Sequence, residues 1–285
     1  MTEGQQAQVV PVARGIIVCA DDFAVNQSAS LGIAKLLALG RLSATSAMVL
    51  SPRWATDVAL LQSVRGQVDV GLHLDWTSDF AVAAGHGLPL GQAMRRALLG
   101  GFDQTQAIAV IERQLDLFEA QWHAAPDFVD GHQHVQQFAG IREALVEVLV
   151  RRYGAQPARP YLRVSRAPSG SAGLKGHIIS WMGSNALENI ADCAHIASAR
   201  GLFGIYNFDG STLDYAVRMR RWLAQAPAGS ILMCHPAQAA EPGDEIGVAR
   251  AQEFAYLVGP EFAAALQTAK VKPVRGRVAL QPGAN

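Results

Sequence analysis

Two adjacent carboxylates, Asp21 and Asp22, close an apolar run that begins at Ile16. A continuous apolar run is typical of a buried parallel strand, and groups at its carboxyl end face the ligand crevice of an α/β fold. Asp22 is a hard oxygen donor suited to a divalent cation. Asp21 would point to the face of the sheet opposite Asp22 if the strand continued, and it would lie beside the metal if the chain turned. Capping of a helix is the alternative for such a pair.

Histidines end other apolar runs in the same manner. His73 follows Val68–Leu72, in which Gly71 would allow close backbone approach. Asp130, His132 and His134 follow the short run Phe128-Val129, and a period of two would place all three on one face. That spacing can deliver one or two metal ligands and a partner that orients them, although a polar surface turn is the alternative.

His235 ends the run that starts at Ile231, and Pro236 then stops the strand. A histidine that titrates near neutral pH suits a general acid that protonates a leaving amine, whereas an isolated His-Pro is more often a strand terminator. Cys234 is interpreted as a core residue, because nothing in the local sequence would lower its pKa.

Four further side chains are candidates for binding or orientation. Arg163 and Arg166 follow a strand led by a tyrosine and could orient a carboxylate base or bind a substrate group, with surface solvation as the alternative. Asp75 and Trp76 come just after His73 and could supply a polar contact and a stacking platform for a sugar ring. Trp76 could equally pack at a rim.

Short β-branched runs alternate with segments of helical period, which is the pattern of βα units around a parallel sheet. The predicted strands are Ile16–Ala20, Ala44–Val49, Val68–Leu74, Phe128–Asp130, Tyr161–Val164, Phe203–Tyr206 and Ser230–Cys234. The predicted helices are Ser28–Leu39, Trp54–Ser63, Thr105–Trp122, Ile141–Tyr153, Leu213–Gln225 and Ala249–Leu257. Repetition without a break in composition favours one closed or nearly closed α/β barrel. Thr77–Gly101 and Ala167–Ser184 are expected to be excursions over its mouth.

Composition narrows the possible partners and the cellular location. The chain of 285 residues is half hydrophobic and balances 24 Lys and Arg against 24 Asp and Glu, so no global field draws it to nucleic acid or an anionic membrane. Three distant cysteines, Cys19, Cys193 and Cys234, suit a reducing cytoplasm. No apolar run reaches membrane-spanning length. We expect a disordered lead-in over 1–14, one barrel domain over 15–275, and a final strand after Lys270 followed by a frayed tail over 276–285.

The motifs Ala20-Asp21-Asp22-Phe23, Gly71-Leu72-His73-Leu74, Asp130-Gly131-His132-Gln133-His134 and Cys234-His235-Pro236 together resemble the YdjC-like carbohydrate deacetylases, distant relatives of the NodB-type polysaccharide deacetylases. The order and rough spacing match over nearly the whole chain. The resemblance implies a distorted, TIM-like βα barrel. It also implies one divalent metal held by Asp22, His73 and His132, with His134 as the second choice for the third ligand.

The resemblance further implies Asp21 as general base, His235 as general acid, and Arg163 in a substrate-facing strand. The chain departs from the family pattern at three positions. Ala24 and Ala237 stand where glycines are expected, and Gln136 stands where a third histidine is expected. These departures place the sugar pocket and the surroundings of the metal in question, but none removes a proposed ligand.

The predicted activity is hydrolysis of an N-acetyl group on an amino sugar or short oligosaccharide, with one divalent ion, magnesium or zinc, as cofactor. One alternative is a metal-dependent phosphoesterase or a hydrolase of another amide or ester. Another is a non-catalytic carbohydrate-binding barrel, although retention of both Asp21 and His235 argues against it. A homodimer is possible.

Overall fold

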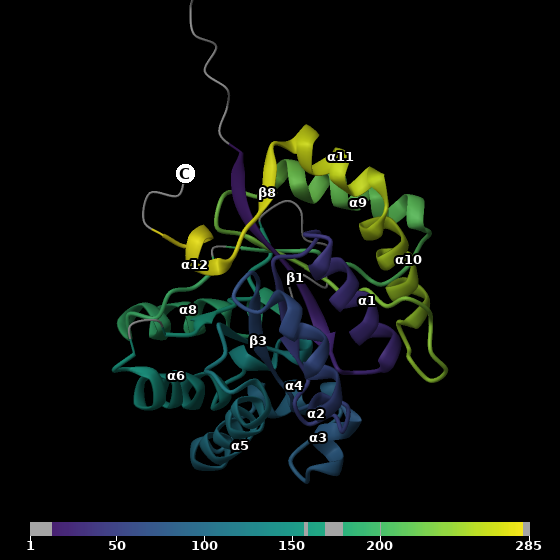
Figure 1. The fold of residues 1–285 in the computed structure, drawn as a ribbon. Helices are drawn as coiled ribbons and strands as arrows, with labels where there is room; N and C mark the ends of the chain where they lie inside the picture. The colour runs from purple at the N-terminus through teal and green to yellow at the C-terminus, as the bar shows by residue number, and fades with distance from the viewer. Residues whose placement is uncertain (1–12, 157–158, 169–178, 200, 282–285) are drawn as a thin grey trace, which may run out of the picture.

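The computed structural model describes residues 13–156, 159–168, 179–199 and 201–281. Its parallel strands curl into a half-barrel of the distorted TIM-like kind, with helices packed around the outside (Figure 1), which confirms the predicted fold class. The expected disorder of residues 1–14 falls almost entirely outside the described residues, as does the middle of the predicted excursion Ala167–Ser184.

A strand forms at each of the predicted runs, with the bounds shifted by a few residues, and one more follows Lys270. The strands are β1 (Arg14–Phe23), β2 (Ala44–Ala47), β3 (Asp69–Leu74), β4 (Phe128–Gly131), β5 (Tyr161–Leu162), β6 (Leu202–Phe203), β7 (Ile231–Cys234) and β8 (Val271–Pro273). The sheet order is β5-β4-β3-β2-β1-β7-β6, and β8 pairs with the start of β1. Every named pair is parallel, so all the carboxyl ends meet at one mouth.

Alternation along each strand separates the barrel interior from the helix-covered outer face. On β1, Ile17 and Cys19 belong to the interior cluster, whereas Ile16, Val18 and Ala20 pack with the helices. On β7, Ile231 and Met233 belong to the same interior cluster, to which β4 and β5 contribute Phe128 and Tyr161. The next residue of each interior row therefore emerges at the mouth, and that is where the polar side chains lie.

The helices connect successive strands and cover the outer face of the sheet (Figure 1). Those that contain predicted helices are α1 (Gln27–Ala38), α2 (Trp54–Asp57), α5 (Gln104–Trp122), α6 (Ile141–Tyr153), α9 (Thr212–Gln225) and α10 (Gly247–Val258). The predicted helix Trp54–Ser63 is only one α-helical turn followed by the 3-10 helix η1 (Val58–Val64). Asn26 caps α1 by accepting a hydrogen bond from Ala29 N at 2.8 Å.

Further helices were not predicted from the sequence. They are α3 (Asp79–Ala83), α4 (Leu90–Leu98), α8 (Ser184–Cys193), α11 (Pro260–Ala269) and α12 (Gly276–Ala279). The first two fall inside Thr77–Gly101, which was expected to be an irregular excursion. Ser78 begins α3 as its N-cap, a signal that the sequence carried but that its alanine and glycine content obscured.

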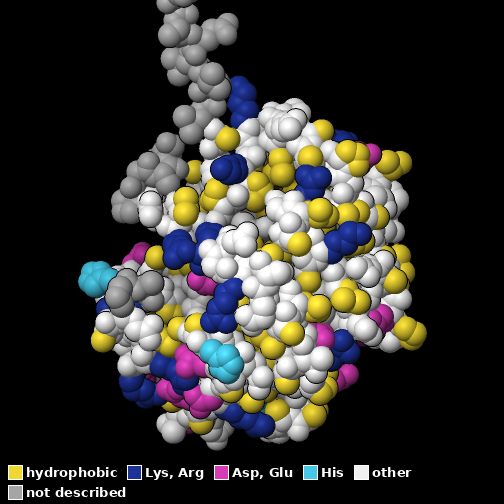
Figure 2. Space-filling view, in the orientation of Figure 1, with side chains coloured by type: hydrophobic (Ala, Val, Ile, Leu, Met, Phe, Trp, Pro, Cys, Tyr) yellow, Lys and Arg dark blue, Asp and Glu magenta, His cyan; other side chains and the backbone are white. Residues whose placement is uncertain are grey.

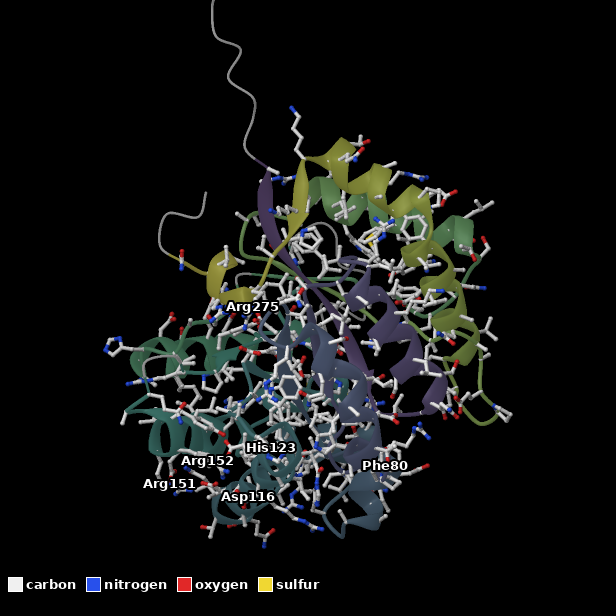
Figure 3. The ribbon with its side chains drawn as sticks, in the orientation of Figure 1. Phe80, Asp116, His123, Arg151, Arg152 and Arg275 are labelled. Carbon is white, nitrogen blue, oxygen red and sulfur yellow. The ribbon has the colours of Figure 1, made fainter. Side chains whose placement is uncertain are left out.

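The tail after β8 is held at the amino ends of the strands and forms α12, so the prediction of fraying over 276–285 was wrong as far as residue 281. Arg275 pairs with Asp69 at 2.6 Å and with Asp127 at 2.8 Å (Figure 3). Gly276 sits so close to the Tyr161 ring that an added Cβ would lie 2.3 Å from it. These contacts of Arg275 attach the tail to the end of the barrel opposite Asp21 and Asp22.

The outer surface carries charges of both signs. Figure 2 shows Lys and Arg interspersed with Asp and Glu on one face. One group of ion pairs joins α5 to α6 and consists of Arg151 and Arg152 with Glu112, Asp116 and Glu119 (Figure 3). Within the described ranges, no helix is both long and apolar enough to cross a bilayer.

Candidate active site at the barrel mouth

A bulge at the end of β1 turns both carboxylates toward the mouth. Asp21 continues the interior row of Ile17 and Cys19, and simple alternation would send Asp22 to the outer face. The pairing of β1 with β2 shifts register between Ala20 and Phe23, and Asp22 adopts a left-handed backbone conformation with φ of 64°. The irregularity therefore brings Asp22 alongside Asp21 instead of behind it.

His73 lies on the interior row of β3 and is oriented by a buried carboxylate. Its Nδ1 donates to Asp130 Oδ1 at 2.6 Å, which leaves Nε2 facing Asp22 Oδ1 at 3.2 Å. Burial alone would lower the pKa of His73, but Asp130 outweighs burial and raises it to about 10. Gly71 makes room for the Phe128 ring, 2.5 Å from where its Cβ would lie, rather than for a neighbouring backbone.

The expectation that Asp130, His132 and His134 share one face was wrong. β4 ends at Gly131, and residues His132–Gln137 form the 3-10 helix η2 with a kink at Gln133 and His134, whose φ values are 52° and 64°. The turn separates the three side chains. Asp130 lies beneath His73, His132 reaches Asp22 with its Nδ1 3.1 Å from Oδ1, and the His134 ring contacts Ser165.

The structure therefore brings together Asp22, His73 and His132 as a possible ligand set. One donor atom from each lies within 4.8 Å of the other two. Metal–ligand bonds of about 2.0–2.2 Å leave neighbouring donor atoms about 3.0–3.5 Å apart, and the separations of 3.1 and 3.2 Å from Asp22 Oδ1 fit that requirement. His134 does not join this group. One carboxylate and two imidazoles suit a divalent ion, and they do not fix which one.

Arg163 is fully buried and holds Asp21 with two hydrogen bonds, of 2.7 and 2.8 Å. A second contact, of 2.9 Å, joins Arg163 to Asp130. Burial would raise the pKa of Asp21, but the arginine outweighs burial and lowers it to about 2. Of the two roles considered for Arg163, the geometry favours orienting the carboxylate, because the guanidinium is enclosed behind Asp21 and does not line the cavity. Arg166 pairs with Glu188 near the surface.

His235 follows β7 on the interior row, with Nε2 3.9 Å from Asp21 Oδ2. Burial lowers its pKa to about 4 in spite of the nearby carboxylates Asp22 and Asp21. The ring is therefore neutral at pH 7 in this state, contrary to the expected titration near neutral pH. Phe208 packs edge-on against the ring with centroids 5.1 Å apart.

Two buried charged residues of α10 reach the site and were missed in the sequence. Glu253 accepts hydrogen bonds from His235 N at 2.6 Å and from the Tyr206 hydroxyl at 2.7 Å. Arg250 donates to Asp22 Oδ2 at 2.7 Å, and it lowers the pKa of Asp22 against the opposing effect of burial. The available signal was their spacing of three residues on one helix, which places two charges on the face that turns inward.

Asp75 and Trp76, which were expected to contact a sugar, lie outside the cavity lining. Asp75 is fully buried and accepts hydrogen bonds from the backbone of Thr77 and Ser78 and from the Ser78 hydroxyl, so it organises the turn before α3. Trp76 is buried edge-on against His86 and Phe102. We therefore give neither residue a role toward substrate.

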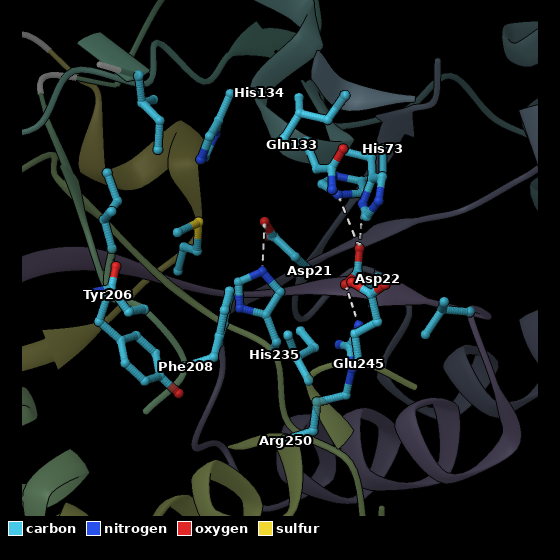
Figure 4. A pocket seen from close by; sticks show the side chains of 18 of the residues that line it. Asp21, Asp22, His73, Gln133, His134, Tyr206, Phe208, His235, Glu245 and Arg250 are labelled. Carbon is cyan, nitrogen blue, oxygen red and sulfur yellow. Dashed lines mark hydrogen bonds and ion pairs between the residues drawn. The ribbon is translucent and has the colours of Figure 1, made fainter. Parts of the chain in front are cut away.

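A cavity of about 1060 Å³ opens over the strand ends. Figure 4 shows Asp21, Asp22, His73, His134 and His235 around its centre. Aromatic side chains of Tyr206, Phe208 and Trp222 line one part of the wall, and the acidic residues Glu241, Asp244 and Glu245 line another. The cavity combines ionised groups with apolar walls, the usual character of a small-molecule site.

The three departures from the expected motif pattern have different structural meanings. Ala24 has φ of 72° and is buried, so a glycine would suit this backbone better. The backbone of Ala237 does not have a positive φ, so this position does not require a glycine. Gln136 is fully buried and donates hydrogen bonds to Arg163 O and Ser165 Oγ.

The sequence of this chain is similar to those of several known proteins. A family profile described as "YdjC-like protein" matches residues 15–268. A human carbohydrate deacetylase is 29% identical over 164 residues, which cover 50% of this chain and 47% of that protein. A mouse carbohydrate deacetylase is 24% identical over 273 residues, covering 80% of this chain and 79% of that one. The match to the human protein thus spans about half of its length.

Solved structures share the fold. A protein of Enterococcus faecalis V583, proposed to cleave cellobiose phosphate, superposes with a TM-score of 0.71 at 16% identity, covering 94% of this chain and all of that one. An uncharacterized protein of Agrobacterium tumefaciens C58 gives a TM-score of 0.51 at 12% identity, covering 95% and 91% of the two chains. At these identities the likeness concerns the fold alone.

Proposed function

Because the chain belongs to the YdjC-like protein family, we propose that it is a metal-dependent hydrolase that removes an N-acetyl group from an amino sugar or short oligosaccharide. One observation carries the proposal. The set Asp22, His73 and His132 adjoins an ionised carboxylate, Asp21, and an imidazole, His235, on the floor of one cavity. Amide hydrolysis needs an electrophile, a base and a proton donor, and these residues are suited to provide all three.

A divalent cation held by Asp22, His73 and His132 would polarise the amide carbonyl and lower the pKa of attacking water. Asp130 keeps His73 oriented by accepting its Nδ1 proton, so that Nε2 is directed to the cation. Arg250 occupies the other oxygen of Asp22 and holds the carboxylate in place. Two of the three ligands, His73 and Asp22, are thus held in place by other side chains of the protein.

Asp21 acts as the general base in this proposal. Its pKa of about 2 keeps it ionised at neutral pH, and Arg163 fixes the plane of the carboxylate. His235 faces the same carboxylate at 3.9 Å and is neutral at rest. We propose that Asp21 takes a proton from water and passes it to His235 Nε2, and that the same nitrogen then gives this proton to the nitrogen of the departing amine, so that the protons balance over one turnover.

The cavity walls support a sugar as the group that carries the amide. Tyr206, Phe208 and Trp222 line the cavity, and aromatic side chains are residues against which sugar rings pack. The curated relatives are themselves carbohydrate deacetylases, which supports the same substrate class.

Release of acetate tests the proposal. Purified protein is stripped of metal with a chelator, supplied with zinc, magnesium, manganese or cobalt, and incubated with N-acetylated monosaccharides and short oligosaccharides. We expect acetate only after a metal is restored. The Asp21→Asn protein should bind metal normally and release no acetate. Asp57→Asn is the matched control, because Asp57 is an equally buried carboxylate on α2 that bonds Ser30 and Arg53.

The outcomes separate the rival activities. Metal-dependent release of another acid or of phosphate, without acetate, would replace the deacetylase with a different hydrolase. Sugar binding with no product from folded, metal-loaded protein would support a binding barrel. Acetate release by Asp21→Asn at the wild-type rate would remove Asp21 as the base.

A further inference from the structure

His134 lines the cavity but stands apart from the ligand set Asp22, His73 and His132. Figure 4 shows its ring directed into the cavity. Both His134 and the preceding Gln133 adopt left-handed backbone conformations, which are unfavourable for side chains of this kind. Such strain persists where the surrounding structure holds a residue in place, and it is common at binding sites. The hydrogen bonds behind the His134 ring indicate what role this residue has.

The first step concerns the orientation of the Gln136 amide. One end of this buried amide lies 3.0 Å from the backbone carbonyl oxygen of Arg163, and the same end lies 3.0 Å from Ser165 Oγ. A carbonyl oxygen can only accept, so the end that contacts it must be the NH2 group. The reversed orientation would place two oxygens against each other. Gln136 therefore donates to Ser165.

The second step concerns the Ser165 hydroxyl, which is fully buried. Its oxygen accepts from Gln136 and lies 2.9 Å from His134 Nδ1. In the part of the chain that the structure describes, the hydroxyl has these two partners. Its single hydrogen therefore points to Nδ1, because any other direction would leave a buried donor without an acceptor.

The third step concerns the His134 ring. Nδ1 accepts the serine hydrogen and so carries none of its own, and a neutral ring then carries its hydrogen on Nε2. Among the described residues, no partner is recorded for Nε2. The relay from Gln136 through Ser165 thus makes His134 a hydrogen-bond donor toward the cavity. The opposite tautomer would offer an acceptor instead.

We propose that His134 is a substrate-binding residue that donates from Nε2–H to a hydroxyl or ring oxygen of the sugar, and that Gln136 and Ser165 set its tautomer. The sugar part of this inference rests on the proposed function. The relay itself depends only on this chain. Gln136 stands where the family pattern has a histidine, and in this proposal it acts on the cavity indirectly, through Ser165 and His134.

Nitrogen-15 NMR of the histidine rings tests the relay without any substrate. In metal-free wild-type protein, assigned through the loss of its signals in His134→Gln, the His134 ring should show a protonated Nε2 and an unprotonated Nδ1. The Ser165→Ala protein should show a mixture of tautomers. Ser230→Ala is the matched control, because Ser230 is as buried and its Oγ has no hydrogen-bond partner among the residues that the structure describes. A protonated Nδ1 in the wild type would overturn the relay.

Sugar binding tests the role of the donor. Dissociation constants for the sugar panel are measured by calorimetry on metal-loaded Asp21→Asn protein, so that turnover does not interfere. Adding His134→Leu should weaken binding about 3- to 10-fold, the usual effect of one hydrogen bond, whereas His134→Gln retains an N–H donor and should recover part of the loss. Equal binding by His134→Leu would overturn the assignment.

The two proposals fail in distinguishable ways. If no sugar binds and the wild type releases no acetate, the proposed function falls together with the sugar-binding role of His134. If acetate is released and sugar binds equally with leucine at position 134, the deacetylase stands and the His134 assignment alone is overturned.

Discussion

Arg163 and Asp21 are joined by two parallel hydrogen bonds, of 2.7 and 2.8 Å, between side chains that are almost completely buried. This bidentate geometry fixes both the position and the plane of the carboxylate. Arg163 also contacts Asp130 at 2.9 Å, so one guanidinium lies between the proposed base and the carboxylate that orients His73. The arginine thereby couples the base to the ligand set.

Replacing Arg163 with lysine should reduce acetate release about 100-fold, because lysine keeps the charge but not the planar pair of donors. The measurement is kcat on the best substrate of the panel. Arg275→Lys is the control, since Arg275 makes a comparable pair of contacts to Asp69 and Asp127 at the amino ends of the strands. That control should lose stability and keep its kcat. An unchanged kcat for Arg163→Lys would show that the base needs no such clamp.

Asp130→Asn should weaken metal binding about 10- to 100-fold, the usual effect of altering a partner that orients a histidine ligand. The amide can still accept from His73 Nδ1, but it lacks the negative charge that strengthens this contact. Affinity is measured by calorimetric titration of metal-free protein with zinc and with manganese. Asp57→Asn should bind as the wild type does. If the Asp130→Asn protein binds metal with wild-type affinity, Asp130 does not contribute to metal binding through His73.

Ala24→Gly should stabilise the protein by about 0.5 to 1 kcal/mol. A left-handed conformation costs an ordinary residue about 1–2 kcal/mol, and the greater entropy of unfolded glycine offsets part of the gain. The free energy of unfolding is measured by urea denaturation. Ala237→Gly is the matched control, because Ala237 lacks the positive φ of Ala24 and should lose stability on the same substitution. A loss of stability in both proteins would contradict the interpretation of Ala24.

Much of the site could be predicted from strand patterns. Residues that follow an interior row must emerge at the mouth, so Asp21, His73 and His235 were expected at neighbouring strand ends from their place in the sequence. The prediction failed where the backbone leaves that regular pattern. The left-handed conformations at Asp22, Gln133 and His134 were not predicted because none of the three is glycine, although Asp and His adopt this conformation more often than most residues.

Contacts contributed from distant parts of the chain were also beyond prediction. Arg250 lies 228 residues after Asp22, and only the packing of α10 against the barrel brings the two together. Ser165 could not be identified from the sequence either, because its role depends on the contacts of its hydroxyl with His134 and Gln136 in the folded chain. Conversely, Asp75 and Trp76 had suitable chemistry and position in the sequence, but the turn before α3 takes both side chains away from the cavity.

Glu253 should impose a pH dependence on stability. Burial raises its pKa from 4.5 to about 7, although hydrogen bonds from Tyr206 and His235 oppose the shift. Between pH 4.5 and 7 the folded state keeps a proton that the unfolded state has lost, so this carboxyl makes stability fall as pH rises, by at most about 1.4 kcal/mol per pH unit. Its contribution is fully present below pH 4.5 and is lost above pH 7.

The Glu253→Gln protein isolates this effect, because glutamine does not titrate. His235 acts in the opposite sense between pH 4 and 6.5, since its lowered pKa leaves the unfolded state with the extra proton. We therefore compare the free energies of unfolding of the two proteins by urea denaturation at pH 5, 6, 7 and 8. The wild type should lose stability relative to Glu253→Gln from pH 5 to 7, and the difference should then level off. A difference that stays constant over the whole range would mean that Glu253 is already ionised at pH 5 and holds His235 as a charged acceptor.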